Sequence, residues 1–145
     1  MNKVKVIDVA DYILQKLGTT SAMKLQKLVY YSQAWHLVWE DNVLFEDEIQ
    51  AWANGPVVPE LYNLHRGHFR LTPGFFHGNI LAINEKSKEV IDKVLLFYGK
   101  KDAQWLSDLT HMEEPWKLAR KGVSDGERGS CPISLESMSE YYSSL

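Results

Sequence analysis

The segment 22–40 constrains the fold more than any other part of this sequence, because apolar side chains surround it on nearly every side when it is drawn as a helix. One side of the wheel carries Leu25, Leu28, Val29, Ser32, Trp35, His36 and Trp39, and the other carries Tyr30, Tyr31, Ala34, Leu37 and Val38. Only Gln26, Gln33 and Glu40, seven residues apart, make a polar stripe. A helix that is apolar almost all round lies inside a protein. The sequence therefore predicts a central buried helix around which the rest of the chain packs.

The remaining pattern predicts a compact, mainly all-α protein in which residues 1–145 form a single domain, a length that fits one domain. Helical periodicity with capping residues predicts further helices over 7–17, 59–66, 85–98, 103–111, 115–121 and 135–143. Asn84, Asp102 and Ser134 stand where helix N-caps are expected. Gly18 and Gly99 stand where helices end.

A small β-hairpin is predicted near 43–53, with 43–45 and 49–53 as its two strands. Gly55 and Pro56 then form a turn, at which Gly55 is expected to adopt a positive φ. Residues 67–83 are rich in glycine and are predicted to form a loop anchored by apolar side chains. These anchors are Phe69, Leu71, Phe75 and Phe76.

Charge and cysteine content limit the classes of partner and compartment. The formal net charge is −3 and the sequence pI is about 5.9, whereas nucleic-acid-binding domains are usually basic. Nucleic acid is therefore not an expected partner. A single cysteine, Cys131, the absence of an apolar leader and the absence of a long apolar run predict a cytoplasmic protein without a membrane span.

Motifs that would indicate an enzyme or a metal site are incomplete. His65, His68 and His77 lie close in sequence without a second ligand pair at zinc-finger spacing. His111 and Glu113 resemble part of a zinc-deaminase signature, but the paired cysteines that should follow are missing. No nucleophile motif surrounds Cys131, and His36 on the apolar helix is interpreted as a hydrogen-bonded core histidine. We therefore expect no catalytic residues, no metal and no cofactor.

The acidic residues are unevenly distributed. Between Lys27 and Arg66 there are six Asp or Glu residues and no Lys or Arg, a local charge of −6. One interpretation is a solvated acidic loop, and the other is a surface that steers a basic protein partner. Under the second interpretation the candidate partner-binding residues are Glu46, Asp47, Glu48, Trp52 and Arg66.

Several motifs occur in an order that resembles the Panacea domain of the SocA-like antitoxins and the phage-associated GepA-like proteins. The resemblance extends over about residues 5–142. The residues that carry it are Lys24, Leu25, Gln26, Lys27, Tyr30, Gln33, Trp35, His36, Trp52, Gly55, Pro56, Pro59, Tyr62, His111, Pro115 and Trp116. Most of them are interpreted as structural, with Trp35, Trp52, Trp105 and Trp116 in the core and His111 linking the helices on either side of it by hydrogen bonds.

The resemblance implies an antitoxin of a type II-like toxin–antitoxin system, often found in prophages, that binds a protein toxin encoded beside it. It also implies toxins of several classes, including alarmone synthetase-like enzymes that stop translation. Two alternatives stay open: an adaptor that delivers the toxin to a protease, and a small hydrolytic or deaminating enzyme. The sequence leaves the toxin class, the binding face and self-association open.

Overall fold

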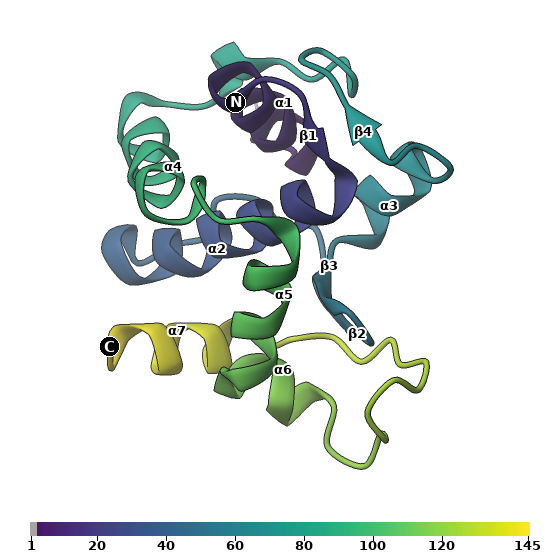
Figure 1. Ribbon diagram of the computed structural model, residues 1–145. Helices are drawn as coiled ribbons and strands as arrows, with labels where there is room; N and C mark the ends of the chain where they lie inside the picture. Colours follow the sequence, from purple (N-terminus) through teal and green to yellow (C-terminus); the bar gives the residue numbers. More distant parts are fainter. Residues whose placement is uncertain (1–2) are drawn as a thin grey trace.

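Helix α2 (Ala22–Glu40) runs through the middle of the fold in the computed structural model, which describes residues 3–145 (Figure 1). Helix α4 lies above it and helix α7 below it in that view. The helices are α1 (Val6–Leu17), α2, α3 (Pro59–His65), η1 (Ile80–Ala82), α4 (Glu85–Tyr98), α5 (Ala103–Met112), α6 (Glu114–Ala119) and α7 (Leu135–Ser143). The strands are β1 (Thr20–Ser21), β2 (Gln50–Trp52), β3 (Gly55–Val57) and β4 (Arg70–Leu71). The prediction of a mainly all-α fold around residues 22–40 is confirmed.

Local sequence signals set the ends of these helices. Ser21 caps α2, since its hydroxyl accepts a hydrogen bond from the Lys24 backbone at 3.1 Å. Asn84, Asp102 and Ser134 cap α4, α5 and α7 in the same way, as predicted. No helix in the described part of the chain is both long and apolar enough to cross a bilayer.

The two glutamines of the polar stripe of α2 are buried, which the helical wheel alone did not indicate. Gln26 is 3% exposed and Gln33 is 1% exposed. The Gln33 amide donates to the Phe45 carbonyl and accepts from the Leu44 N–H, both at 2.7 Å. Gln26 makes the same pair of bonds to the backbone of Val58, at 3.3 Å and 2.9 Å. Each glutamine thus satisfies a buried non-helical segment as a neighbouring strand would.

A β-hairpin exists and β2 lies within the predicted strand 49–53, but Gly55 and Pro56, predicted to form a turn, belong to its second strand β3. β2 pairs antiparallel with β3 through the two-residue turn at Ala53 and Asn54, and Trp52 stands opposite Gly55. Residues 43–45 form no strand because Gln33 already occupies their backbone groups. The free edge of β2 is covered by residues 131–133, through the Ala51 N–H to the Cys131 carbonyl at 2.8 Å.

The loop 67–83 is tied down partly by apolar anchors and partly by two buried carboxylates. Leu71 and Phe76 are buried, but Phe69 is 87% exposed, so its prediction as an anchor is wrong. Asp11 of α1 accepts hydrogen bonds from the backbone of Phe76 at 3.1 Å and of Gly78 at 2.6 Å. The sheet between β1 and β4 was not predicted, because strands of two residues carry no periodic signal.

The tryptophans predicted to lie in the core differ in burial. Trp116 is 5% exposed, whereas Trp35 and Trp52 are half-buried and Trp105 is 41% exposed. The core prediction is therefore right for Trp116 and wrong for Trp105.

Candidate functional site

The β2–β3 hairpin is held by side chains of α5 and α6 that hydrogen-bond four consecutive backbone carbonyls at its turn. The bonds run from Arg120 to Ala51 (3.3 Å), from Trp116 to Trp52 (2.9 Å), from His111 to Ala53 (2.8 Å) and from Ser107 to Asn54 (2.5 Å). Arg120 also donates to the carbonyls of Ser124 and Glu127, so the same side chain secures the loop after α6. We call this arrangement the hairpin clamp. Because every member donates to backbone, the clamp fixes the conformation of the hairpin whatever its side chains are.

His111 takes part in the clamp in a way that differs from the sequence prediction. Its Nε2 lies 2.8 Å from the Ala53 carbonyl, and its Nδ1 lies 2.6 Å from the Ser107 carbonyl on its own helix. The predicted hydrogen bonds between α5 and α6 are therefore wrong, since the ring bonds the hairpin instead. Its contact with α6 is the packing of the imidazole against the Trp116 ring, with centroids 4.0 Å apart.

Lys27 and Gly55 lie beneath the clamp in direct contact. Gly55 has φ +124°, which confirms the predicted positive φ, and an added Cβ would lie 2.6 Å from Lys27 Cε and 3.0 Å from Thr110 Oγ1. Lys27 is 1% exposed, and no carboxylate lies within 4.0 Å of its Nζ among residues 3–145. Burial lowers the pKa of Lys27 to about 8. A buried charged amine without a counter-ion lowers the free energy of unfolding. Lys27 therefore destabilises the fold through its charge, although its side chain packs tightly beneath the hairpin.

The acidic run proposed to bind a partner is divided among different internal contacts. Glu46 pairs with Lys3 at 3.1 Å on the surface. Asp47 accepts from the Val6 N–H at 3.3 Å, at the beginning of α1. Glu48 accepts from the Gln50 side chain at 2.8 Å. Asp47 thus has a structural contact, and Glu48 is the member that lies beside the hairpin.

Trp52 and Arg66, the other two candidate residues, both adjoin Tyr62 of α3. The Trp52 ring packs edge-on against the Tyr62 ring at 4.8 Å, and the Arg66 N–H donates to the Tyr62 carbonyl at 2.9 Å. Trp52 Nε1 in turn donates to Gln50 Oε1 at 2.9 Å. Tyr62 is half-buried and Arg66 is exposed. We call the surface made by Glu48, Gln50, Trp52 and Tyr62, with the exposed Arg66 four residues after Tyr62 at its edge, the hairpin face.

A second polar cluster, at the junction of α5 and α6, holds the last helix. Glu113 is 5% exposed, and its Oε1 accepts hydrogen bonds from the hydroxyls of Tyr31 and Tyr142, both at 2.7 Å. Tyr142 also lies 3.0 Å from the Tyr30 hydroxyl. Burial raises the pKa of Glu113 and of all three tyrosines. The burial of Glu113 and its contacts with the tyrosines were not predicted, because nothing in the local pattern shows which carboxylate is buried.

The other residues that carry the family resemblance, the signature residues, also lie at internal contacts. His36 is buried, and its Nδ1 donates to the Asn42 carbonyl while Nε2 accepts from Ser87, each at 2.8 Å. Lys24 donates to the Gly99 carbonyl at 2.6 Å, and Gln26 also reaches Nε2 of His65 at 3.0 Å. Burial lowers the pKa of His65, which agrees with an acceptor role for that nitrogen. Signature residues of low exposure also include Leu25, Tyr30, Pro56 and Pro115, whereas Pro59 begins α3.

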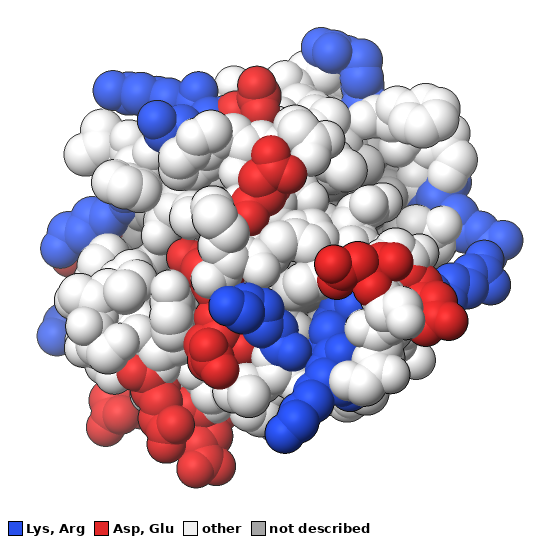
Figure 2. Space-filling view, turned by 60° about the horizontal axis from the view of Figure 1, so that its bottom comes forward, with Lys and Arg blue, Asp and Glu red and all other residues white. Residues whose placement is uncertain are grey.

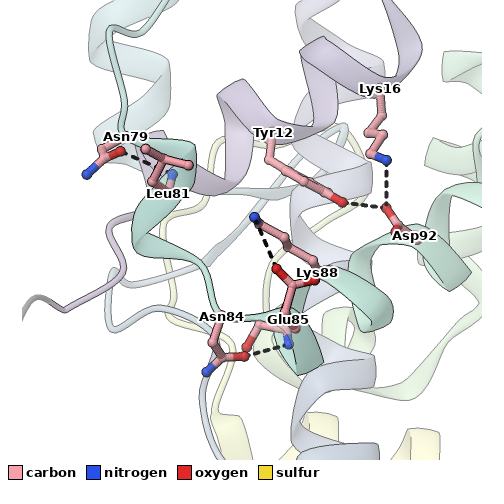
Figure 3. Close-up of polar contacts among 9 residues, drawn as sticks. Tyr12, Lys16, Asn79, Leu81, Asn84, Glu85, Lys88 and Asp92 are labelled. Carbon is pink, nitrogen blue, oxygen red and sulfur yellow. Dashed lines mark hydrogen bonds and ion pairs between the residues drawn. The ribbon is translucent and has the colours of Figure 1, made fainter.

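A hollow with a volume of about 480 Å³ lies between α1, η1 and α4 (Figure 3). Most of its charged side chains are engaged with neighbouring side chains. Tyr12 donates to Asp92 at 2.8 Å, Lys16 lies 4.0 Å from the same carboxylate, and Lys88 lies 3.7 Å from Glu85. Among residues 3–145 no group of three His, Cys, Asp or Glu side chains is placed to hold a metal ion. Cys131 is exposed, and neither nitrogen of the buried His36 bonds it.

The surface charge is mixed. On the face shown in Figure 2, Lys and Arg side chains alternate with Asp and Glu side chains across large areas of neither kind. No continuous field of one sign covers that face, as a site for a phosphate backbone would require.

These features define a mainly helical domain in which buried polar side chains hold a short hairpin rigid beside an aromatic surface. A family model for the antitoxin SocA-like Panacea domain matches residues 25–117, from α2 into α6. The chain belongs to this family of antitoxins. Comparisons with curated proteins and with solved structures gave no significant match.

Proposed function

We propose that this protein neutralises a cognate protein toxin by binding it directly, and that the hairpin face makes the contact. The observation that carries this proposal is the hairpin clamp. Three side chains of α5 and α6, together with Arg120 at the end of α6, bond the backbone of an eight-residue hairpin. A hairpin that is fixed before binding loses little conformational entropy when it meets a partner.

The side chains of the hairpin face suit a protein contact. Trp52 and Tyr62 stack edge-on and remain half-buried, so they present aromatic area at low entropic cost. Aromatic residues of this kind dominate the energetics of protein interfaces. Glu48 and Arg66 lie at the rim, where charges govern the rate of association and its dependence on salt. Glu48 gives the rim an acidic group that complements a toxin with a basic, nucleotide-binding active site.

In this proposal the antitoxin is part of a type II-like system and inhibits its toxin by binding it stoichiometrically, not by catalysis. The arrangement of the polar groups supports it: the buried histidine, lysine and carboxylate described above are used in packing and hydrogen bonding. Delivery of the toxin to a protease is a separate mechanism that needs a further partner.

The test takes the product of a reading frame beside this gene, shown first to be toxic when expressed alone, and mixes it with the antitoxin, both purified and with no protease present. Equimolar antitoxin is expected to abolish toxin activity. Trp52→Ala and Tyr62→Ala are each expected to weaken binding about tenfold or more, since central aromatic residues contribute above about 1.4 kcal/mol. Leu81→Ala is the matched control, because Leu81 is 83% exposed on η1, away from the hairpin.

Charge is tested separately with Glu46→Gln combined with Glu48→Gln, which spares the Asp47 contact to α1. This variant is expected to associate more slowly at low salt and to match the wild type at high salt. Unchanged binding by the Trp52 and Tyr62 variants would place the toxin contact elsewhere. Neutralisation that appears only when a protease is added would favour the adaptor mechanism.

A further inference from the structure

A row of alternating aromatic and basic side chains crosses α4 from the end of α2 to the beginning of α5. Its members are Trp39, Lys93, Phe97, Lys101 and Trp105, and we call it the cation–aromatic row. Trp39 is 46% exposed, Phe97 is 64% exposed and Trp105 is 41% exposed. Leu96 beside them is 72% exposed. Large apolar side chains gathered in this way are uncommon on a protein surface without a partner.

Each tryptophan of the row lies under a lysine. Lys93 Nζ lies 5.5 Å from the centroid of the Trp39 ring, and Lys101 Nζ lies 4.7 Å from the centroid of the Trp105 ring. Phe97 follows Lys93 by four residues on α4, so the two side chains are neighbours on one helix face. The row therefore has an apolar centre flanked by two positive charges.

The two lysines have no carboxylate within 4.0 Å among residues 3–145. The nearby acids are occupied elsewhere: Asp92 accepts from Tyr12, and Asp102 accepts from the Trp105 backbone at 2.8 Å. Glu89, one turn before Lys93 on α4, also lies beyond 4.0 Å from any lysine Nζ. The ammonium groups keep their hydrogen-bond donors for an external acceptor, because contact with a ring face uses none of them.

We infer that the cation–aromatic row is a docking surface for an acidic amphipathic segment of a partner protein. Two carboxylates of that segment pair with Lys93 on α4 and with Lys101 just beyond its end, and apolar side chains between them cover Phe97 and Leu96. A single-stranded nucleic acid fits less well, because bases stack on open ring faces and here a lysine covers one face of each tryptophan.

The part of this surface on α4 lies apart from the proposed toxin contact. In Figure 1, α4 and the β2–β3 hairpin lie well apart, with α2 between them. The charge preference is also opposite: the row selects an acidic partner, whereas the rim of the hairpin face suits a basic one. One antitoxin molecule could therefore hold two proteins at once, and loss of one contact would leave the other.

The probe is a designed alanine-rich helical peptide with two Glu residues about two turns apart and Leu residues between them. A second peptide carries Gln in place of both Glu residues. Binding to the full chain is followed by titration calorimetry and by tryptophan fluorescence, to which Trp39 and Trp105, two of the five tryptophans, contribute. The Glu peptide is expected to bind about fivefold or more tightly than the Gln peptide at low salt.

Substitutions test whether a preference for the Glu peptide arises from the cation–aromatic row. Lys93→Gln combined with Lys101→Gln is expected to remove the preference for the Glu peptide, and Phe97→Ala is expected to weaken both peptides about tenfold. Lys117→Gln combined with Lys121→Gln, two exposed lysines near α6, is the matched control and should change nothing. Equal binding of the two peptides, or no binding of either, overturns the inference. Displacement of the Glu peptide by a short oligothymidine at lower concentration also overturns it and assigns the row to nucleic acid.

Discussion

Replacing Lys27 by Met tests whether a charged amine is buried beneath the hairpin. The substitution keeps the length and apolar stem of the side chain and removes only the ionisable group. Lys27 is 1% exposed, lies against Gly55, and has its pKa lowered by burial from 10.5 to about 8. The folded protein therefore holds the Lys27 proton less tightly than the unfolded chain does.

The magnitude follows from the difference between the two pKa values. Each pKa unit corresponds to about 1.4 kcal/mol, so burial of the charged amine costs the wild type about 3 kcal/mol. Below pH 8 both states carry the proton and the full cost is present. Between pH 8 and 10.5 the folded state gives up its proton while the unfolded state keeps it, so the cost disappears as pH rises.

The assay is urea unfolding of the wild type and Lys27→Met from pH 7 to 10.5. We expect the variant to be more stable by about 3 kcal/mol at pH 7, less a small loss of packing, and the difference to shrink towards zero near pH 10.5. Ionisation of the tyrosines above pH 10 affects both proteins and cancels in the difference. Lys86→Met, at an exposed position of α4, is the control and should show no such trend. A stability difference that stays constant over this pH range would refute the reasoning.

Three other substitutions test the neighbouring contacts. Gly55→Ala is expected to lower the free energy of unfolding by about 2 kcal/mol or more, because its Cβ would meet Lys27 Cε at a φ of +124°. Gly67→Ala, at φ +87° in open space, is the control and should cost about 1 kcal/mol. Equal losses in urea denaturation would show that the clash with Lys27 contributes nothing. Glu113→Gln is expected to be at least as stable as the wild type at pH 7, because burial raises the pKa of Glu113. The wild type therefore loses stability as pH rises above the ordinary pKa of a glutamate. Unfolding at pH 4 and pH 8 measures this loss, and a variant less stable than the wild type at pH 8 would argue against the prediction. His111→Ala is expected to lower the free energy of unfolding by about 1–3 kcal/mol and to speed hydrogen exchange in the hairpin. His111→Gln should keep most toxin neutralisation. Complete loss of neutralisation by a His111→Gln variant whose hairpin remains protected from exchange would point to a chemical role.

The sequence by itself determined the features that depend on residues close together in the chain. The limits of α2 and α7 and the caps at Asn84, Asp102 and Ser134 agree with the structure, because a cap and the first turn it serves lie within four residues. The positive φ of Gly55 was predicted correctly from the residue type, although Gly55 lies in β3 and not in the predicted turn. The order of motifs was also sufficient to identify the antitoxin family.

Only the tertiary structure decided which polar side chains are buried and what they hold. A helical wheel shows that Gln26 and Gln33 share a stripe, but not that backbone segments far along the chain come to lie against it. The strand partner of β2 was mistaken because Gln33 competes for the backbone of residues 44–45 from twelve residues away.

The candidate site shows the same limit. The sequence placed Glu46, Asp47 and Glu48 together as one acidic patch, yet the fold sends Asp47 to the beginning of α1 and leaves Glu48 beside the hairpin. The hairpin clamp joins Ala51 to Arg120 and Trp52 to Trp116, pairs separated by more than sixty residues. Such contacts form when packed helices bring remote segments together, and a hydrogen bond depends on the final distance between two atoms, which no local pattern specifies.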